Sequence, residues 1–214
     1  MEVLEVNEFR QVSDFNKISL KSVGDIHLYQ GNQNSVRIVA KENVSNQIEI
    51  NVINDELQIT HKKKFPFEFM SGKPEFHITV IQLTEVTVAG AGKIISENCL
   101  KANKIKLNNK GVGGLFIHVE ANEISTHQAG VGKIELKGEA EKLEVNLTGT
   151  GKVNGFELLA KEVEVNSKGV GKCCINVSEK LNAVLKGIGK VEYKGNPPVF
   201  NCNRTGIGTI EKVN

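Results

Sequence analysis

The segment GVGKIELKGEAEKLEVNLTGTGKV, residues 130–153, decides the fold of this chain. It begins with one Gly-x-Gly-Lys motif and reaches the next after nineteen residues. Between the motifs apolar and polar residues alternate, as in Leu143-Glu-Val-Asn-Leu147. Alternation with a period of two is typical of a β-strand that buries one face. Each unit therefore predicts a strand, a glycine corner and a second short strand.

The Gly-x-Gly pair recurs throughout the second half of the chain. Successive first glycines are separated by 21, 19, 19, 20, 18 and 19 residues, and the fourth residue after each of them is apolar. Repeats of this length are the sequence signature of a solenoid, in which equivalent residues stack from coil to coil. The pairs begin at Gly90, Gly111, Gly130, Gly149, Gly169, Gly187 and Gly206.

These repeats predict an all-β fold, a single-stranded parallel β-helix with about 19 residues per coil and roughly nine to eleven coils. We favour a right-handed helix because inward positions come as close alternating pairs. The alternative, a left-handed helix, uses a strict hexapeptide repeat. Glycine suits corners where positive φ or close approach between coils excludes a Cβ atom. We expect the middle residue of each motif to be tucked under its corner.

We expect one domain over residues 1–214, with N-terminal strands and a flap in residues 9–80 and repeat coils in residues 81–214. The N-terminal strands are expected to form the first turns of the helix. The flap carries three phenylalanines, Phe65, Phe67 and Phe69. It is interpreted either as a hydrophobic cover packed on the solenoid or as an exposed aromatic contact surface.

Composition excludes several classes of protein. The chain has 27 basic and 25 acidic residues and a net charge of +2, which is too balanced to indicate a nucleic-acid partner. No apolar run approaches the ~18 residues of a transmembrane helix. The N-terminus lacks the features of a signal peptide, so we expect either a cytoplasmic protein or an exported one whose leader has been removed.

The motifs predict no cofactor and no metal. Gly-x-Gly-Lys lacks the spacing and the hydroxyl residue of a phosphate-binding loop. From residue 83 onward there is no Asp, which excludes a calcium-binding β-roll. The five histidines form no pair with the spacing of zinc ligands. We expect four free thiols, at Cys99, Cys173, Cys174 and Cys202.

One feature of the repeat points to a binding site. A lysine follows the glycine pair in five of the seven motifs, and stacking would align these lysines into a basic stripe. Such a stripe suits an anionic glycan or a lipid headgroup, and the alternative is a solvated corner without a ligand. The candidate ligand-binding residues are Lys93, Lys133, Lys152, Lys172 and Lys190.

Three parts of the chain together resemble a known bacterial family. They are residues 10–20, the stretch Val23-Gly-Asp-Ile26 with the following Gln30-Gly31, and the serial Gly-x-Gly-Lys units. In these the chain resembles the putative auto-transporter adhesin, head GIN domain family. The resemblance implies a right-handed single-stranded β-helix that is usually exported, often lipid-anchored, and without an established biochemical activity. It therefore implies an extracytoplasmic location, at the cell surface or in the periplasm.

Two function classes compete on this evidence. We favour a non-catalytic, adhesion-like module of the cell surface or envelope, with a surface glycan or another protein as partner. The alternative is a carbohydrate-active enzyme, a polysaccharide lyase or hydrolase, because β-helices host such enzymes and fold alone does not decide function. The clustered acids Glu135, Glu139, Glu141 and Glu144 are explained by solvated strand faces. We expect a monomer, with an end-to-end dimer as the alternative.

Overall fold

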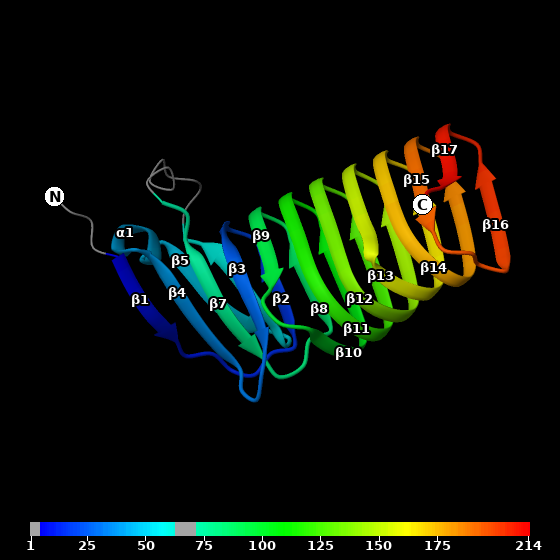
Figure 1. Ribbon diagram of the computed structural model, residues 1–214. Helices are drawn as coiled ribbons and strands as arrows, with labels where there is room; N and C mark the ends of the chain where they lie inside the picture. Colours follow the sequence, from blue (N-terminus) through cyan, green and yellow to red (C-terminus); the bar gives the residue numbers. More distant parts are fainter. Residues whose placement is uncertain (1–4, 63–71) are drawn as a thin grey trace.

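The structure is a computed structural model that describes residues 5–62 and 72–214 (Figure 1). Phe65, Phe67 and Phe69 lie outside the described residues. The described part contains seventeen strands in one continuous hydrogen-bonded arrangement and one short helix. The elements are β1 (Glu5–Arg10), β2 (Lys17–Leu20), β3 (Val23–Gln30), β4 (Ser35–Lys41), α1 (Glu42–Ser45), β5 (Ile48–Ile53), β6 (Glu56–His61), β7 (Glu75–Val80), β8 (Glu85–Val88), β9 (Ala91–Ser96), β10 (Leu100–Asn109), β11 (Val112–Gln128), β12 (Val131–Leu147), β13 (Thr150–Ser167), β14 (Val170–Leu185), β15 (Ile188–Lys194), β16 (Val199–Arg204) and β17 (Ile207–Lys212).

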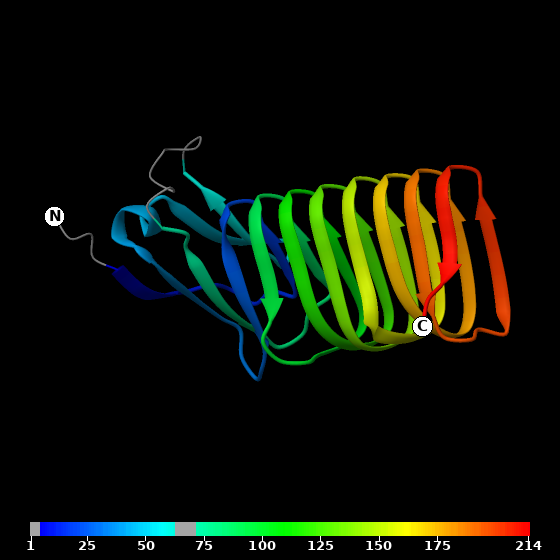
Figure 2. The same cartoon turned by 45° about the horizontal axis from the view of Figure 1, so that its top comes forward.

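The repeats form the solenoid that the sequence predicts, with about seven turns. β11 to β14 each run from one glycine corner, around a bend, to the next corner, and each pairs in parallel with its neighbour. In Figure 2, with the N-terminus on the left, chain in the near layer runs downward and chain in the far layer runs upward. A chain that rotates in this sense while it advances to the right forms a right-handed helix.

We call the near layer of Figure 2 the front sheet and the far layer the back sheet. The front sheet contains β3, β9 and the first segments of β11 to β14, followed by β15 and β17. The back sheet contains β2, β8, the end of β10, the last segments of β11 to β14, and β16. The Gly-x-Gly corners join the two sheets along one edge of the rod, the upper edge in Figure 2.

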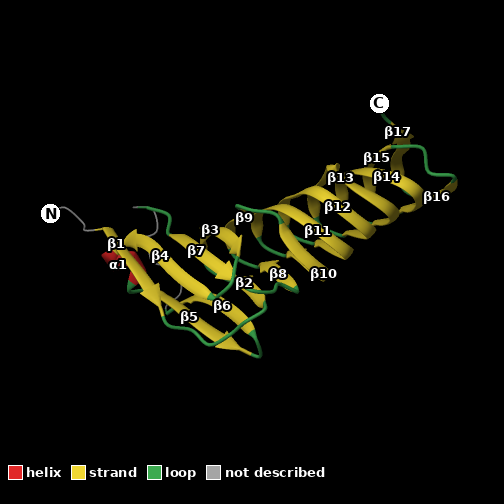
Figure 3. Ribbon diagram, turned by 60° about the horizontal axis from the view of Figure 1, so that its bottom comes forward, coloured by secondary structure: helices red, strands yellow, loops and turns green. Residues whose placement is uncertain are grey.

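The expected nine to eleven coils are wrong, because the N-terminal strands β1, β4 and β5 pair antiparallel and do not coil. β2 and β3 stack in parallel on β8 and β9, and β6 and β7 stack in parallel on the other side of β2 and β3. Beyond them, β4 pairs antiparallel with β7 and β1, and β5 forms an antiparallel pair with β6 (Figure 3). Asn54 and Asp55 both have positive φ in the tight β5–β6 turn, which reverses the chain instead of carrying it round another coil.

The core is a stack of apolar rows between the two sheets. Burying each such aliphatic side chain contributes on the order of 1.5–3 kcal/mol. Each coil covers the row of the previous one, so stability accumulates along the rod. The row at the fourth residue after each first glycine is completely buried in six coils, at Ile94, Leu115, Ile134, Val153, Cys173 and Val191.

The glycine pairs are required because successive coils touch at the corner. A Cβ atom on Gly132 would overlap the carbonyl oxygen of Gly113 in the preceding coil, and Gly132 also has a φ of +138°. The first glycine of each pair is equally crowded, as Gly130 is by Gly111. Both reasons expected for glycine therefore operate, and close approach between coils is the general one.

The middle residue of the motif does not lie where we expected it. Instead of being tucked under the corner, Val131 is 55% exposed and Ile207 is 74% exposed. The backbone of the preceding coil occupies the space beneath the corner, so the side chain can only project outward. An aliphatic ladder thus runs along the upper edge of the rod.

Candidate binding surface

The five candidate lysines stack in one row on the front sheet. Strand register places Lys133 beside Lys152, Lys152 beside Lys172, and Lys172 beside Lys190. Lys93 is separated from Lys133 by Gly114. The alignment follows from the repeat, because a residue at one phase of each coil occupies one row of the sheet.

Carboxylates neutralise part of this row. Glu192 is 8% exposed and accepts contacts from Lys172 at 2.7 Å and Lys190 at 3.3 Å. The hydrogen bond from Lys172 outweighs desolvation and, with Lys190, holds the pKa of Glu192 below its usual value. Glu211 also pairs with Lys190. The C-terminal end of the row is therefore an internally paired cluster.

The N-terminal end of the row contacts an aromatic ring. The ammonium group of Lys133 lies 4.7 Å from the ring centroid of Phe116 and 2.9 Å from Glu135, and that of Lys93 lies 6.0 Å from the same ring. Cation–π contacts at exposed sites contribute about 0.5–1 kcal/mol each. They orient the lysine stems, and of the two lysines only Lys93 has no carboxylate within ion-pair distance among the described residues.

A second set of lysines flanks the same corner and was missed in the sequence. Lys110, Lys168 and Lys186 stand two residues before the middle residue of their motifs, at the margin of the back sheet, and all three are exposed. Within residues 5–62 and 72–214, no carboxylate lies within ion-pair distance of them or of Lys152. The recurring Lys-Gly-x-Gly pattern could have revealed this set.

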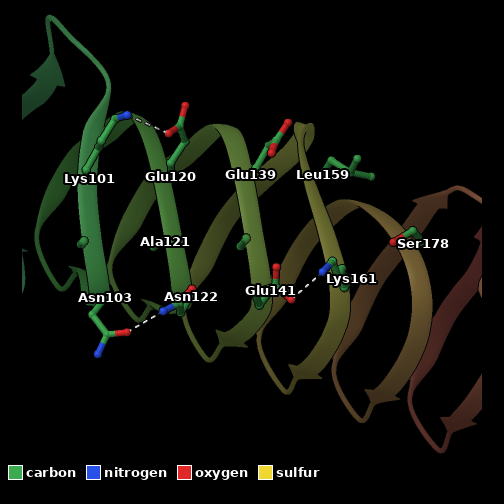
Figure 4. A pocket seen from close by; sticks show the side chains of 12 residues that line it. Lys101, Asn103, Glu120, Ala121, Asn122, Glu139, Glu141, Leu159, Lys161 and Ser178 are labelled. Atoms are coloured by element: carbon green, nitrogen blue, oxygen red, sulfur yellow. Dashed lines mark hydrogen bonds and ion pairs between the residues drawn. The ribbon is translucent and has the colours of Figure 1, made fainter.

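The opposite edge of the rod has a different character. There the strands bend over a ladder of alanines at Ala102, Ala121 and Ala140, which forms the floor of an open groove of about 670 Å³. Figure 4 shows Glu120 and Glu139 on one rim and Asn122 and Glu141 on the other. The charges of this edge are largely paired: Lys101 with Glu120, Lys104 with Glu123, Lys161 with Glu141, and Lys180 with Glu162.

The four clustered acids do not converge into a catalytic pair. Glu135 is paired with Lys133 on the front sheet, and the Glu144 carboxylate accepts a hydrogen bond from Asn146 on the back sheet. Glu139 and Glu141 line the groove, but both are exposed. A general acid requires a carboxyl group whose environment favours the proton, and burial is the usual means.

Two histidines stack on the front face of the N-terminal strands. The rings of His27 and His77 lie 5.0 Å apart, and Nδ1 of His27 is 2.6 Å from Glu97. Desolvation, with Arg37 and His27 nearby, lowers the pKa of His77. In the described part of the chain no three metal-ligating side chains gather at one point.

All four cysteines are free, as expected. Cys173 is fully buried in the core, where desolvation raises its thiol pKa well above the ordinary value. Cys174 faces the other way but is also buried, 3.9 Å from Glu192. Cys99 and Cys202 are half-buried. No helix in residues 5–62 and 72–214 has the length and hydropathy needed to cross a membrane.

The fold places this protein in the class of parallel β-solenoids. Residues 14–197 match the family model described as putative auto-transporter adhesin, head GIN domain. The chain belongs to this family, whose adhesin designation suggests a cell-surface location. No curated protein matches the chain.

Solved structures agree with this assignment. A putative adhesin from Bacteroides fragilis is similar at a TM-score of 0.94 and 28% identity, covering 98% of this chain and 97% of its own. Two Parabacteroides distasonis proteins share the fold over the same fractions of the chains. One, titled a putative lipid binding protein, has a TM-score of 0.74 at 19% identity, and the other, a putative adhesin, has 0.73 at 21%.

Proposed function

We propose that this protein is a non-catalytic, extracytoplasmic binding module that holds a ligand with closely spaced anionic groups along its lysine row. One observation carries the proposal. The row presents cations at the spacing of hydrogen-bonded strands, about 4.8 Å, and the central Lys152 has no carboxylate partner among the described residues. A row of regularly spaced cations attracts a polymer with repeated anionic groups or a surface that carries many of them.

The enzyme alternative lacks a comparable observation. The groove on the opposite edge holds three exposed carboxylates, and two of them, Glu120 and Glu141, are already ion-paired with lysines. A carbohydrate-active enzyme of the usual kind needs two carboxyl groups with different proton affinities on either side of one bond. A screen for polysaccharide degradation tests this directly, and activity abolished by Glu139→Gln or Glu141→Gln would establish the enzyme instead.

The binding proposal is tested by retention on immobilised dextran sulfate. Retention is expected to weaken with salt, because exposed charges are screened within about 10 Å at 0.1 M ionic strength. The double variant Lys93→Ala, Lys152→Ala removes the two lysines of the row that have no carboxylate partner among the described residues and should elute earlier, and the charge-preserving pair Lys93→Arg, Lys152→Arg should not. The matched control is Lys101→Ala, Lys104→Ala, whose lysines are paired with Glu120 and Glu123. Equal elution of all variants would refute the proposal.

We also propose that the rod works as a monomer. Among the described residues no strand pairs with the outer edges of β16 and β17, and β17 carries the charged residues Glu211 and Lys212. Charged side chains on an edge strand oppose pairing with another edge. Light scattering at micromolar concentration should give the monomer mass, and a dimer mass would contradict this.

A further inference from the structure

The middle residues of the glycine motifs form an exposed aliphatic ridge. Parallel register aligns them at the corner, and over the five steps from Val112 to Ile207 the strand spacing gives a line of about 24 Å. At one rung Thr150 replaces the aliphatic residue. The exposed fractions are 62% for Val112, 55% for Val131, 49% for Val170, 53% for Ile188 and 74% for Ile207.

The fold does not require aliphatic side chains at these positions. The corner depends on its two glycines, whose missing Cβ atoms admit the backbone of the preceding coil. Thr150 shows that a β-branched polar residue occupies the same corner. A contiguous row of exposed apolar side chains is a feature of interaction sites, whereas single exposed apolar residues are ordinary.

Lysines flank the ridge on both sides. The five lysines of the front row lie on one side, and Lys110, Lys168 and Lys186 lie on the other, at the margin of the back sheet. The two sheets face in opposite directions, so a ligand lying on one of them meets only one set of lysines. A plane that meets the rod edge-on can reach both sets and the ridge between them.

The chemistry of this edge fits an anionic bilayer. Lysines beside an anionic lipid surface are attracted to its headgroups, and short aliphatic side chains between them enter the interface. A soluble polyanion would leave the ridge in water. A second copy of this edge would bring lysines against lysines.

We propose that this protein docks edge-on to anionic phospholipid bilayers through the aliphatic ridge and the lysines on both of its flanks. This inference rests on the proposed function, because it names the anionic ligand of the same lysine row. It also gives the rod an orientation. The corner edge faces the membrane, and the groove over the alanine ladder faces away from it.

The inference is tested by flotation with vesicles of phosphatidylcholine, with and without phosphatidylglycerol. Binding is expected only when phosphatidylglycerol is present. The variant Lys168→Gln, Lys186→Gln should bind about 5-fold more weakly for each lysine removed. The variant Val170→Thr, Ile188→Thr keeps β-branching and should bind about 5-fold more weakly for each residue, because the apolar transfer is lost. Circular dichroism checks that each variant is folded.

Two controls match these variants. Lys101→Gln, Lys104→Gln removes charge from the opposite edge, and Ile53→Thr removes an aliphatic side chain that is 51% exposed away from the ridge. Both should bind vesicles as the wild type does. Unchanged vesicle binding by the Lys168→Gln, Lys186→Gln variant or by the Val170→Thr, Ile188→Thr variant would overturn edge-on docking. The lysines of the front sheet alone would then account for vesicle binding. Retention on dextran sulfate without binding to phosphatidylglycerol vesicles would overturn this inference alone, whereas loss of both would remove the proposed function as well.

Discussion

Replacing Gly132 by alanine tests whether contact between coils is what the glycine ladder provides. The new Cβ atom would overlap the backbone carbonyl oxygen of Gly113, and neither group can move without shifting a stacked coil. The φ of +138° adds backbone strain, because L side chains rarely adopt it. Strain of this kind costs on the order of 1–3 kcal/mol, and overpacking a similar amount.

We therefore expect Gly132→Ala to lose about 4 kcal/mol of stability. For a chain of this size, 1 kcal/mol corresponds to about 2–4 °C in Tm, so the melting temperature should fall by about 8–16 °C. Thermal melts followed by circular dichroism in the β-sheet band measure this shift. Resistance to urea should fall in parallel.

Gly155 provides the matched control. A Cβ atom at Gly155 would lie 3.4 Å from the carbonyl oxygen of Cys174 and 3.9 Å from Cδ2 of Leu143, which are ordinary contacts. Alanine also reduces the entropy of the unfolded chain, worth about 0.4–1 kcal/mol. Gly155→Ala should therefore melt at or slightly above the wild-type temperature. If Gly132→Ala melted with it, coil contact at the corner would not explain the repeat.

Three further predictions concern titratable groups. The folded-state pKa of Glu192 lies below the reference value of 4.5, so its pairing with Lys172 and Lys190 stabilises the fold above that pH and is lost as pH falls through the folded value. Glu192→Gln should accordingly lower Tm by about 3 °C at neutral pH and not in strong acid, and an equal difference at both would contradict the pairing. The pKa of His77 lies below 6.5, so the stability that neutral His77 contributes is present above that pH and is lost below it, and an NMR titration midpoint above 6.5 would count against this. A thiol reagent should leave Cys173 unmodified in the native protein and modify four cysteines after denaturation, and equal native reactivity of all four would disagree with its burial.

The sequence alone determined the solenoid, its period and its buried rows. The repeated Gly-x-Gly motif marks the positions at which successive coils touch. Residues at the same position of each repeat must then stack in one row, so the sequence pattern predicts which residues are neighbours in the fold. The resemblance of the motifs to the head GIN domain family identified the family correctly. The lysine row was predictable for the same reason as the core row that contains Leu115 and Ile134.

Only the tertiary structure decided what lies between and beyond these rows. The exposure of Val131 and Ile188 depends on the preceding coil filling the space beneath the corner, which no local pattern reports. The antiparallel ends of the N-terminal sheets depend on pairing between β1, β4 and β7, which are distant in sequence. The neutralisation of Lys172 and Lys190 by Glu192, and the unpaired state of Lys168 and Lys186 within the described residues, depend on distances across strands. Periodicity assigns a residue to a row, but the packing of neighbouring coils determines whether that row is buried, paired or available to a ligand.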